Sequence, residues 1–530
     1  MTLPDHLHQQ GEPDMSPTGR SAGLIWGLRA FGLAMALLVY ALLGGSEGLA
    51  PDARTVAAVG TLMAIWWMTE AIPLSATALL PIVLIPALTE RTVAEATQPY
   101  ASSIVFLFLG GFLIAIAMEK WNLHRRIALL TLRRVGVAPK RIVLGMMLAT
   151  GFLSMWVSNT ATTLMMLPIG LSVLTLVVDR GSRQDGAAAA DALGGGARIS
   201  EAIQDPNIRA FGVCLVLSIA WAASMGGLGT LLGSPPNAIV AGYAATELGR
   251  EIGFLEWMML GVPIAFSFIV IAWFLMTNVL YRFDLPEVPG GRRMIDDQIA
   301  QLGPMSQGER MVMYVFLGAA FFWVVPGLLT SLPGVEDAAP WLGGFDDTAI
   351  AIAAGLVMFL LPGEGRSRMV LEWRDAENGL PWGVLLLFGG GLSLASAVAA
   401  SGLDGWFGAQ VTGLGTLPSI LLVASVVTII LFLTEITSNT ATAATFIPIL
   451  GGVALGIGAD AMSLLIPAAL AATCAFMLPV GTPPNAIVFG TGTVTIAQMA
   501  RGGFVLNIVG ILLITGVCYL LGGMAMGLEF

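Results

Sequence analysis

Five residues, Ser-Asn-Thr-Ala-Thr, occur twice in this sequence of 530 residues, at Ser158–Thr162 and Ser438–Thr442. A second motif is repeated as Gly233–Val240 (Gly-Ser-Pro-Pro-Asn-Ala-Ile-Val) and Gly481–Val488 (Gly-Thr-Pro-Pro-Asn-Ala-Ile-Val). The four segments carry hydroxyl and amide groups, and none contains Lys, Arg or His. Because a serine nucleophile needs a neighbouring base, these residues indicate ligand binding by hydrogen bonds and argue against an intramembrane hydrolase.

The side chains of these motifs carry no positive charge, but the helix ends that the motifs create carry partial charges. Paired prolines cannot sit inside a helix, so each Pro-Pro-Asn motif predicts a helix broken into two halves. Ser, Asn and Thr favour caps and turns, which predicts a further interruption at each pentapeptide. Helix N-termini at these points suit an anion, and carbonyls at opposite helix ends suit a hard cation such as Na⁺. We therefore expect an anion and a cation to share one site.

The elements that hold these motifs must lie in lipid. With 56% hydrophobic and 11% charged residues, the chain cannot cover a water-facing surface of its own. The net charge of −10 comes from residues in short connectors and gives no indication of nucleic-acid binding. The apolar stretches that approach or reach the roughly 20 residues needed to cross a bilayer include Ile25–Leu43, Val56–Met68, Ile104–Met118, Met311–Leu329 and Thr348–Leu361.

Charge placement predicts how the chain is threaded, because connectors rich in Lys and Arg remain in the cytoplasm. The alternate connectors, with Glu47 and Asp404 among their residues, are acidic or neutral and are expected outside. The basic connectors are Lys120–Arg141, Arg180–Arg198, Arg282–Arg310 and Arg366–Arg374.

The same rule predicts two re-entrant hairpins. Arg141–Val178 has basic connectors on both sides, so it should enter and leave from the cytoplasm, with Ser158-Asn159-Thr160 at its tip. Because no Lys or Arg occurs from Ser401 to Asp460, Leu417–Ala459 should enter from outside, with Ser438-Asn439-Thr440 at its tip.

The repeated motifs occur in the same order in both halves, which predicts two structural repeats. The helices predicted to be broken are Ala210–Ala245 and Leu464–Gly490. An odd number of crossings between the hairpins inverts the second repeat relative to the first. The five predicted crossings are Ala210–Ala245, Phe254–Tyr281, Met311–Leu329, Ala349–Leu361 and Trp382–Ala400.

With these motifs the sequence resembles the divalent anion/sodium symporter family (DASS), which includes bacterial and eukaryotic di- and tricarboxylate transporters. The resemblance covers almost the whole chain after Leu24. It includes both Ser-Asn-Thr tips and both Pro-Pro-Asn breaks, and also Trp67–Pro73 and Phe106–Gly111.

The resemblance implies an all-α polytopic protein with about eleven transmembrane helices, two re-entrant hairpins and two inverted-topology repeats. It also implies a homodimer in the bacterial cytoplasmic (inner) membrane, with a cytoplasmic N-terminus and an elevator motion of a transport domain past a scaffold. The expected units are a disordered tail (1–23), scaffold and interfacial helices (24–138), a first transport repeat (139–281), a cytoplasmic linker (282–310), further scaffold helices (311–400) and a second transport repeat (401–530).

The resemblance assigns the motif residues to two kinds of ligand, with Na⁺ as the coupling ion and no organic cofactor. The substrate anion is expected at Ser158, Asn159, Thr160, Ser234, Pro235, Ser438, Asn439, Thr440, Thr482 and Pro483. One sodium ion is expected at Ser154, Ser158, Asn159 and Gly233, and a second at Thr434, Thr437, Asn439 and Gly481.

Several questions stay open at this point. Sodium-coupled symport of a C4-dicarboxylate such as succinate, malate or fumarate is the expected function, and a sodium-independent exchanger and a carrier of citrate, sulfate or another divalent anion are the alternatives. Glu435 lies beside the outer tip, where either proton coupling or hydrogen bonding to backbone is open and the second is favoured. The Ala/Gly-rich insertion Gly181–Arg198 is expected to be a flexible loop without an assigned role.

Overall fold

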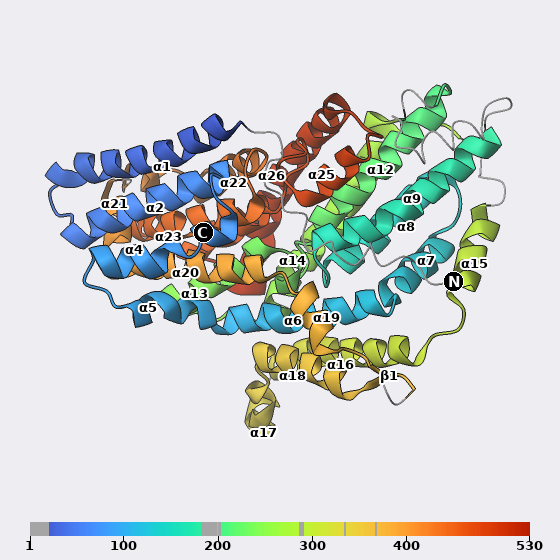
Figure 1. Cartoon of the computed structure of the whole chain (residues 1–530), viewed down its shortest axis with the longest axis horizontal. Helices are drawn as coiled ribbons and strands as arrows, with labels where there is room; N and C mark the ends of the chain where they lie inside the picture. The colour runs from blue at the N-terminus through green and yellow to red at the C-terminus, as the bar shows by residue number, and fades with distance from the viewer. Residues whose placement is uncertain are drawn as a thin grey trace.

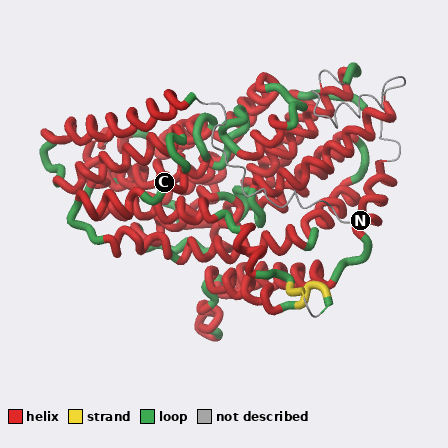
Figure 2. The backbone as a smooth tube through the Cα atoms, viewed as in Figure 1, coloured by secondary structure: helices red, strands yellow, loops and turns green. Residues whose placement is uncertain are grey.

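The structure, a computed structural model, describes residues 21–181, 199, 203–285, 291–332, 335–365, 368–410 and 412–530. Helices make up almost all of this part of the chain (Figure 2). Residues 1–20 of the expected tail and residues 182–198 of the expected loop lie outside the described residues. The first helix begins at Ala22, within the segment 1–23 that was expected to be a tail.

The N-terminal helices form one side of the molecule, where α1, α2, α4 and α5 lie together and α6 runs along the edge (Figure 1). Helix α7 is amphipathic, with arginines on one face, and it connects α6 to the first hairpin. These elements are α1 (Ala22–Leu42), α2 (Pro51–Thr69), α3 (Leu74–Thr77), α4 (Leu80–Leu88), α5 (Val93–Thr97), α6 (Ser103–Lys120) and α7 (Leu123–Val135).

The next helices contain the first pentapeptide and the first Pro-Pro-Asn motif. Helix α12 is the central element of the core, because it packs against α8, α9, α14 and α25 and its Trp221 is fully buried. The elements are α8 (Pro139–Ser154), α9 (Asn159–Gly181), α12 (Pro206–Gly226), the 3₁₀ turn η4 (Leu231–Gly233), α13 (Pro235–Glu247) and α14 (Phe254–Leu275), which ends in a π-turn at Met276–Leu280.

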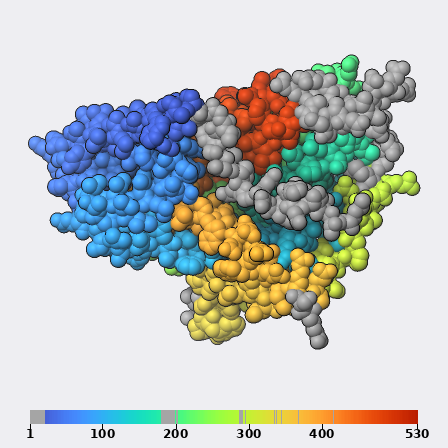
Figure 3. Space-filling model, viewed as in Figure 1, coloured from blue at the N-terminus to red at the C-terminus, as the bar shows by residue number. Residues whose placement is uncertain are grey.

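The middle of the chain includes a lobe, formed mainly by residues 307–330 and 335–360, that projects from one edge of the molecule (Figure 1 and Figure 3). Two of its features were not predicted: the amphipathic helix α15 in the linker, and an antiparallel pair of short strands that pairs Pro362 with Met369. The elements are α15 (Gly291–Leu302), α16 (Gln307–Thr330), α17 (Val335–Ala338), α18 (Asp347–Leu360), β1 (Pro362–Glu364), β2 (Arg368–Met369), α19 (Trp373–Gly379) and α20 (Trp382–Ser401).

The C-terminal part repeats the arrangement of two helices, a broken helix and a long helix. Its two broken-helix segments, α24 and α25, are separated by ten residues that contain Pro479 and Gly481. The elements are α21 (Leu403–Gln410), α22 (Ser419–Thr434), α23 (Asn439–Ile457), α24 (Ala461–Ala472), α25 (Pro483–Gly490) and α26 (Ile496–Met526).

Within the described ranges, nine helices are long and apolar enough to cross a membrane. Large apolar side chains cover their outer faces: Leu37 and Leu512 are each 70% exposed and Leu360 is 76% exposed, which suits lipid and not water. The prediction of an all-helical, multi-span membrane protein is thereby confirmed in its coarse form, with the β1–β2 pair as a small addition. Four shorter apolar helices are Leu74–Leu88, Asp347–Leu360, Ser419–Thr434 and Ala461–Ala472.

Candidate functional site

The two pentapeptides lie where one helix ends and the next begins. Helix α8 ends at Ser154 and α9 begins at Asn159, so Ser158 caps α9 and its Oγ accepts from the Ala161 N–H at 3.2 Å. In the second half, α22 ends at Thr434 and α23 begins at Asn439. The interruptions were predicted correctly, but Thr160 and Thr440 belong to the first helical turn and not to the tip itself.

The helix pairs approach from opposite ends of the molecule. In Figure 1, α8 and α9 occupy one half of the view, and α22 and α23 occupy the other. Their interrupted ends meet the two broken helices, since α12 packs against both α8 and α9, and α24 packs against both α22 and α23. The molecule therefore presents two hairpins whose tips converge on its interior.

Each Pro-Pro-Asn motif starts the second half of a broken helix, as predicted. Pro235 and Pro483 stand at the first positions of α13 and α25, where a missing N–H costs nothing. Thr482 caps α25 by accepting from the Asn485 N–H at 3.3 Å.

The motif asparagines clamp the breaks. Asn237 Nδ2 donates to the carbonyls of Gly227 and Thr230, both at 2.8 Å. Asn485 Nδ2 donates in the same way to the carbonyls of Ala475 (3.0 Å) and Leu478 (3.1 Å). Both side chains are fully buried. These hydrogen bonds hold the non-helical backbone of both breaks in place. The other carbonyls of each break are not bonded by these asparagines.

A first group of oxygens surrounds the Asn159 amide. One terminal atom of this amide lies 2.5 Å from Ser154 Oγ, 3.0 Å from the Ala223 carbonyl oxygen and 3.2 Å from the Gly233 carbonyl oxygen. Ser154 and Gly233 are buried, so these oxygens are shielded from water. When the terminal atom is the amide oxygen, three oxygens lie within about hydrogen-bond distance of a fourth. This oxygen-only group fits a hard monovalent or divalent cation.

A second group repeats the first around the Asn439 amide. The corresponding terminal atom lies 2.7 Å from Thr434 Oγ1, 3.1 Å from the Ala472 carbonyl oxygen and 3.2 Å from the Gly481 carbonyl oxygen. Thr434 and Gly481 are buried as well. The two groups have the same composition and come from different halves of the chain. This repetition indicates that both groups serve the function and did not arise by chance.

Glycine is required beside the first group because the backbones approach closely. A Cβ on Gly227 would lie 2.8 Å from Asn159 Oδ1 and 3.0 Å from the Gly233 carbonyl oxygen, and a Cβ on Gly233 would lie 2.6 Å from the Gly227 carbonyl oxygen. In the second group, a Cβ on Gly481 would lie 3.0 Å from the Thr434 carbonyl oxygen. Any larger residue at these positions would displace the oxygen groups.

The residues predicted to bind the anion at the tips are less buried than Ser154, Gly233, Thr434 and Gly481 of the oxygen groups. Ser158, Asn159, Thr160 and their counterparts Ser438, Asn439 and Thr440 are all half-buried. Of the predicted break residues, Ser234 and Thr482 are buried, Pro235 is half-buried and Pro483 is exposed.

Ser234 joins the two halves of the site. Its Oγ lies 3.0 Å from Thr473 Oγ1, where α24 ends, and the Thr473 carbonyl lies 3.4 Å from Asn439 Nδ2. The two repeats therefore share one polar centre.

Thr437 is expected to serve the second sodium site through its carbonyl and not through its hydroxyl. The hydroxyl donates to the Leu433 carbonyl at 2.9 Å and lies 2.6 Å from Thr442 Oγ1. The carbonyls of Ala223 and Ala472, in contrast, belong to the groups and were not predicted.

Glu435 is held by backbone, which confirms the favoured interpretation of this buried acid. A carboxylate that accepts from consecutive N–H groups is stabilised by them without a basic partner. The donors are the N–H groups of Phe476 (2.7 Å), Met477 (3.0 Å) and Leu478 (3.1 Å) and the side-chain amide of Asn507 (2.8 Å). Glu435 therefore ties the second hairpin, α22–α23, to the break between α24 and α25 and to α26.

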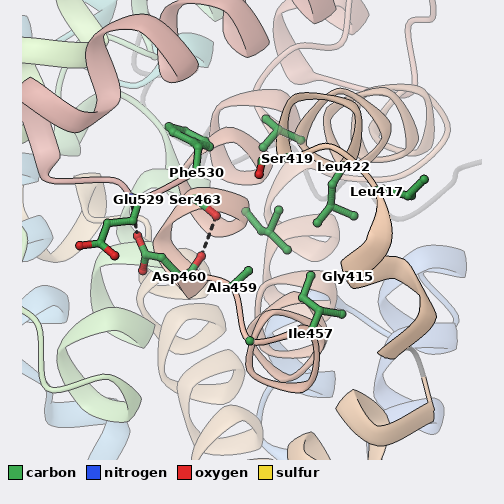
Figure 4. A pocket seen from close by; sticks show the side chains of 13 residues that line it. Gly415, Leu417, Ser419, Leu422, Ile457, Ala459, Asp460, Ser463, Glu529 and Phe530 are labelled. Carbon is green, nitrogen blue, oxygen red and sulfur yellow. Dashed lines mark hydrogen bonds between the residues drawn. The ribbon is translucent and has the colours of Figure 1, made fainter.

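A hollow lies at the base of the second hairpin, α22–α23, away from the tips (Figure 4). It is lined by Ser419 at the start of α22, by Asp460 and Ser463, and by the C-terminal Glu529. Because α22 is 16 residues long, its two ends are about 24 Å apart. The hollow is therefore not part of the candidate site.

Residues 24–528 match the family described as "Sodium:sulfate symporter transmembrane region". The chain belongs to this family. Membership confirms the predicted family and the prediction of a transporter and not an enzyme. The sodium-dependent dicarboxylate transporter SdcS of Staphylococcus saprophyticus is 40% identical over 96% of this chain and 93% of its own length. The protein of the same name from Staphylococcus aureus is 40% identical over 97% of this chain and 93% of its own length.

Two solved transporter structures are similar in fold. The YdaH transporter of Alcanivorax borkumensis has a TM-score of 0.55 and 14% sequence identity, covering 95% of this chain and 98% of that chain. The Neisseria gonorrhoeae protein MtrF has a TM-score of 0.51 and 12% identity, covering 93% of this chain and 94% of that chain. At these identities the likeness concerns the architecture alone.

Proposed function

We propose that this member of the family is a sodium-dependent carrier of small dicarboxylates such as succinate, malate and fumarate. The observation that carries the proposal is the pair of like oxygen groups around Asn159 and Asn439, each beside a half-buried Ser-Asn-Thr tip. The names of the SdcS relatives support a dicarboxylate as the substrate and sodium as its coupling ion.

The chemistry of the site suits both ligands. Each group offers a hydroxyl, an amide oxygen and two carbonyls, which are the hard ligands that Na⁺ takes in proteins. The N-termini of α9 and α23 begin directly at Asn159 and Asn439, so unpaired N–H groups there favour a carboxylate. One carboxylate at each tip matches an anion that carries two of them. The hydroxyls of Ser158 and Ser438 are proposed to complete the anion contacts.

The finer architecture is also part of the proposal. Eleven crossings in two inverted repeats give one hairpin from each membrane face, and the opposed ends of α8–α9 and α22–α23 support this threading. The segments 139–281 and 401–530 form the transport domain, and 24–138 and 311–400 form a scaffold that stays fixed while the transport domain slides as an elevator. The segment 282–310 joins them on the cytoplasmic side.

We further propose a homodimer in a bacterial cytoplasmic membrane with its N-terminus inside. The basic residues of α7 and α15 support a cytoplasmic placement of both helices. Native mass spectrometry of the purified chain checks the assembly, and a monomer that retains full transport would remove the dimer from the proposal.

Uptake into proteoliposomes tests the function. Labelled succinate should accumulate with an inward Na⁺ gradient and should not accumulate when K⁺ replaces Na⁺. Uptake without any Na⁺ dependence that is stimulated by internal succinate would indicate an exchanger. Uptake of sulfate or citrate in place of succinate would reassign the substrate. No uptake of any of these anions would refute transport of this class.

A substitution in the site tests whether the measured uptake depends on the site or is leakage through the membrane. Asn159→Ala removes the amide around which the first oxygen group is built, and we expect it to lose both succinate binding and sodium dependence. Asn278→Ala is a matched control, because this amide lies at the end of α14 and bonds Lys140 and Phe274 instead. Normal transport by the Asn159 variant would remove this residue from the site.

A further inference from the structure

The Asn159 and Asn439 amides each place one terminal atom among three oxygens. Whether this atom is the amide oxygen or the amide nitrogen decides whether the group needs a cation. If it is oxygen, the group contains four oxygens and needs a cation. If it is nitrogen, its two hydrogens are donated to the same oxygens and no cation is needed. The two hydrogens of the nitrogen can reach two of the three oxygens, and at Asn439 the amide oxygen then faces the Thr473 carbonyl at 3.4 Å. Four oxygens without a cation would leave buried acceptors facing one another.

The turn between the two arrangements is sterically easy. The terminal torsion of asparagine is broad and roughly two-fold, and the oxygen and nitrogen have nearly the same size and reach. The second group already contains a compatible network, since Thr434 Oγ1 donates to the Ala472 carbonyl at 2.9 Å and is then free to accept from the amide nitrogen. The surrounding helices need not move.

The turn also changes what the other terminal atom presents. Both side chains are half-buried, and for Asn439 the second terminal atom lies 3.4 Å from the Thr473 carbonyl, next to the polar centre shared with Ser234. When nitrogen faces the oxygen group, the amide oxygen faces the polar centre and repels a carboxylate. When oxygen faces the group, the NH₂ faces the polar centre and can donate to a carboxylate.

We infer that the Asn159 and Asn439 amides turn on sodium binding, and that this turn makes the site attractive to the anion only after sodium has bound. The inference rests on the proposed sodium-dependent transport. It adds that the turn of the two amides is what couples anion binding to sodium binding. By linkage, the factor by which sodium raises anion affinity equals the factor by which the anion raises sodium affinity. No charged side chain is needed for this coupling.

Hydrogen exchange of the side-chain NH₂ groups tests the turn in the full-length protein. Without sodium, the two NH₂ groups are enclosed by carbonyls and should exchange slowly. Sodium alone should speed their exchange about tenfold or more, because they lose these partners and face the accessible side. Succinate added with sodium should slow the exchange again. NMR of ¹⁵N-asparagine-labelled protein measures the rates, and Asn159→Asp and Asn439→Asp assign the signals.

The amides of Asn237 and Asn485 are internal controls, because they are buried in the adjacent breaks and donate to carbonyls throughout. Their exchange should not respond to sodium. If sodium speeds all four amides, general opening of the breaks explains the result and the turn is refuted. Unchanged or slower exchange of the Asn159 and Asn439 amides, in protein whose melting temperature rises with sodium, would refute it as well.

The Asp variants supply a second, independent readout. Aspartate has two oxygens and cannot offer nitrogen to the group, so Asn159→Asp should melt at a lower temperature than the unaltered protein without sodium. Sodium should then raise its melting temperature by more than it raises that of the unaltered protein. Asn278→Asp, outside the groups, should show the ordinary sodium response. A protein with no sodium response at all would instead refute the sodium sites, and with them the proposed function.

Discussion

At the scale of single residues, the site is built from backbone as much as from side chains. Asn159 and Asn439 could be found in the sequence because the repeated pentapeptide marks them, and the family resemblance added Ser154 and Thr434. The carbonyls of Ala223 and Ala472 could not, because every residue carries a carbonyl and only the exact end of a helix decides which one points inward. The close approach of Gly227 to Asn159 depends on the same geometry.

Gly227→Ala should weaken the first sodium site without unfolding the protein. The added methyl would lie 2.8 Å from Asn159 Oδ1 and 3.0 Å from the Gly233 carbonyl, so both ligands must shift. Overpacking of this kind costs roughly 1–3 kcal/mol, and a loss of that size in sodium binding raises the half-saturating sodium concentration about fivefold to more than a hundredfold. Gly516→Ala on α26 is the control, since nothing lies within 4 Å of its Cβ position. An unchanged sodium requirement in the Gly227 variant would contradict the assignment.

Glu435→Gln should destabilise the outer hairpin. The glutamine amide would turn an NH₂ toward N–H groups of Phe476, Met477 and Leu478 that now find a carboxylate, so donors would face donors. Leaving buried donors unpaired costs about 1–3 kcal/mol each, and a drop in melting temperature measures the loss. Glu377→Gln, on an exposed part of α19, should melt as the unaltered protein does. A stable Glu435 variant with altered pH dependence of transport would favour proton coupling instead.

At the scale of elements, the interruptions of helices were predictable and the connectors were not. Two adjacent prolines can stand only at a helix start, so the breaks before Pro235 and Pro483 follow from the sequence. Helix α15 is short and polar on one face, and its packing against α7, with Arg133 3.2 Å from Asp296, provides the contact that its sequence alone does not reveal. The β1–β2 pair is likewise too short to leave a recognisable pattern.

Trp156→Ala should loosen the first hairpin from α16. The Trp156 ring lies near the tip and packs against Phe254 (5.8 Å between ring centroids), Phe316 (5.0 Å) and Trp323 (6.3 Å). Truncating a buried aromatic ring costs about 3–5 kcal/mol, which should appear as a clear drop in melting temperature. The repeat counterpart Ile436 is 60% exposed, so Ile436→Ala should have little effect. Equal losses at the two positions would show that the tips are packed alike.

At the scale of the whole molecule, the distribution of charge and the opposed directions of the two hairpins support the same proposed threading through the membrane. Arginines gather on α7 and α15, whereas the outer hairpin and its connectors contain none from residue 401 to residue 460. The proposed inversion of the repeats would give each membrane face one hairpin.

Labelling of introduced cysteines tests this threading in intact cells. Glu47 and Arg293 are exposed and are expected on opposite faces. A membrane-impermeant maleimide should label Glu47→Cys in intact cells and Arg293→Cys only after permeabilisation. The native thiols of Cys214, Cys474 and Cys518 are buried, so the unaltered protein is an unlabelled background. If both introduced cysteines react in intact cells, an even number of crossings separates residues 47 and 293, and the predicted threading is wrong.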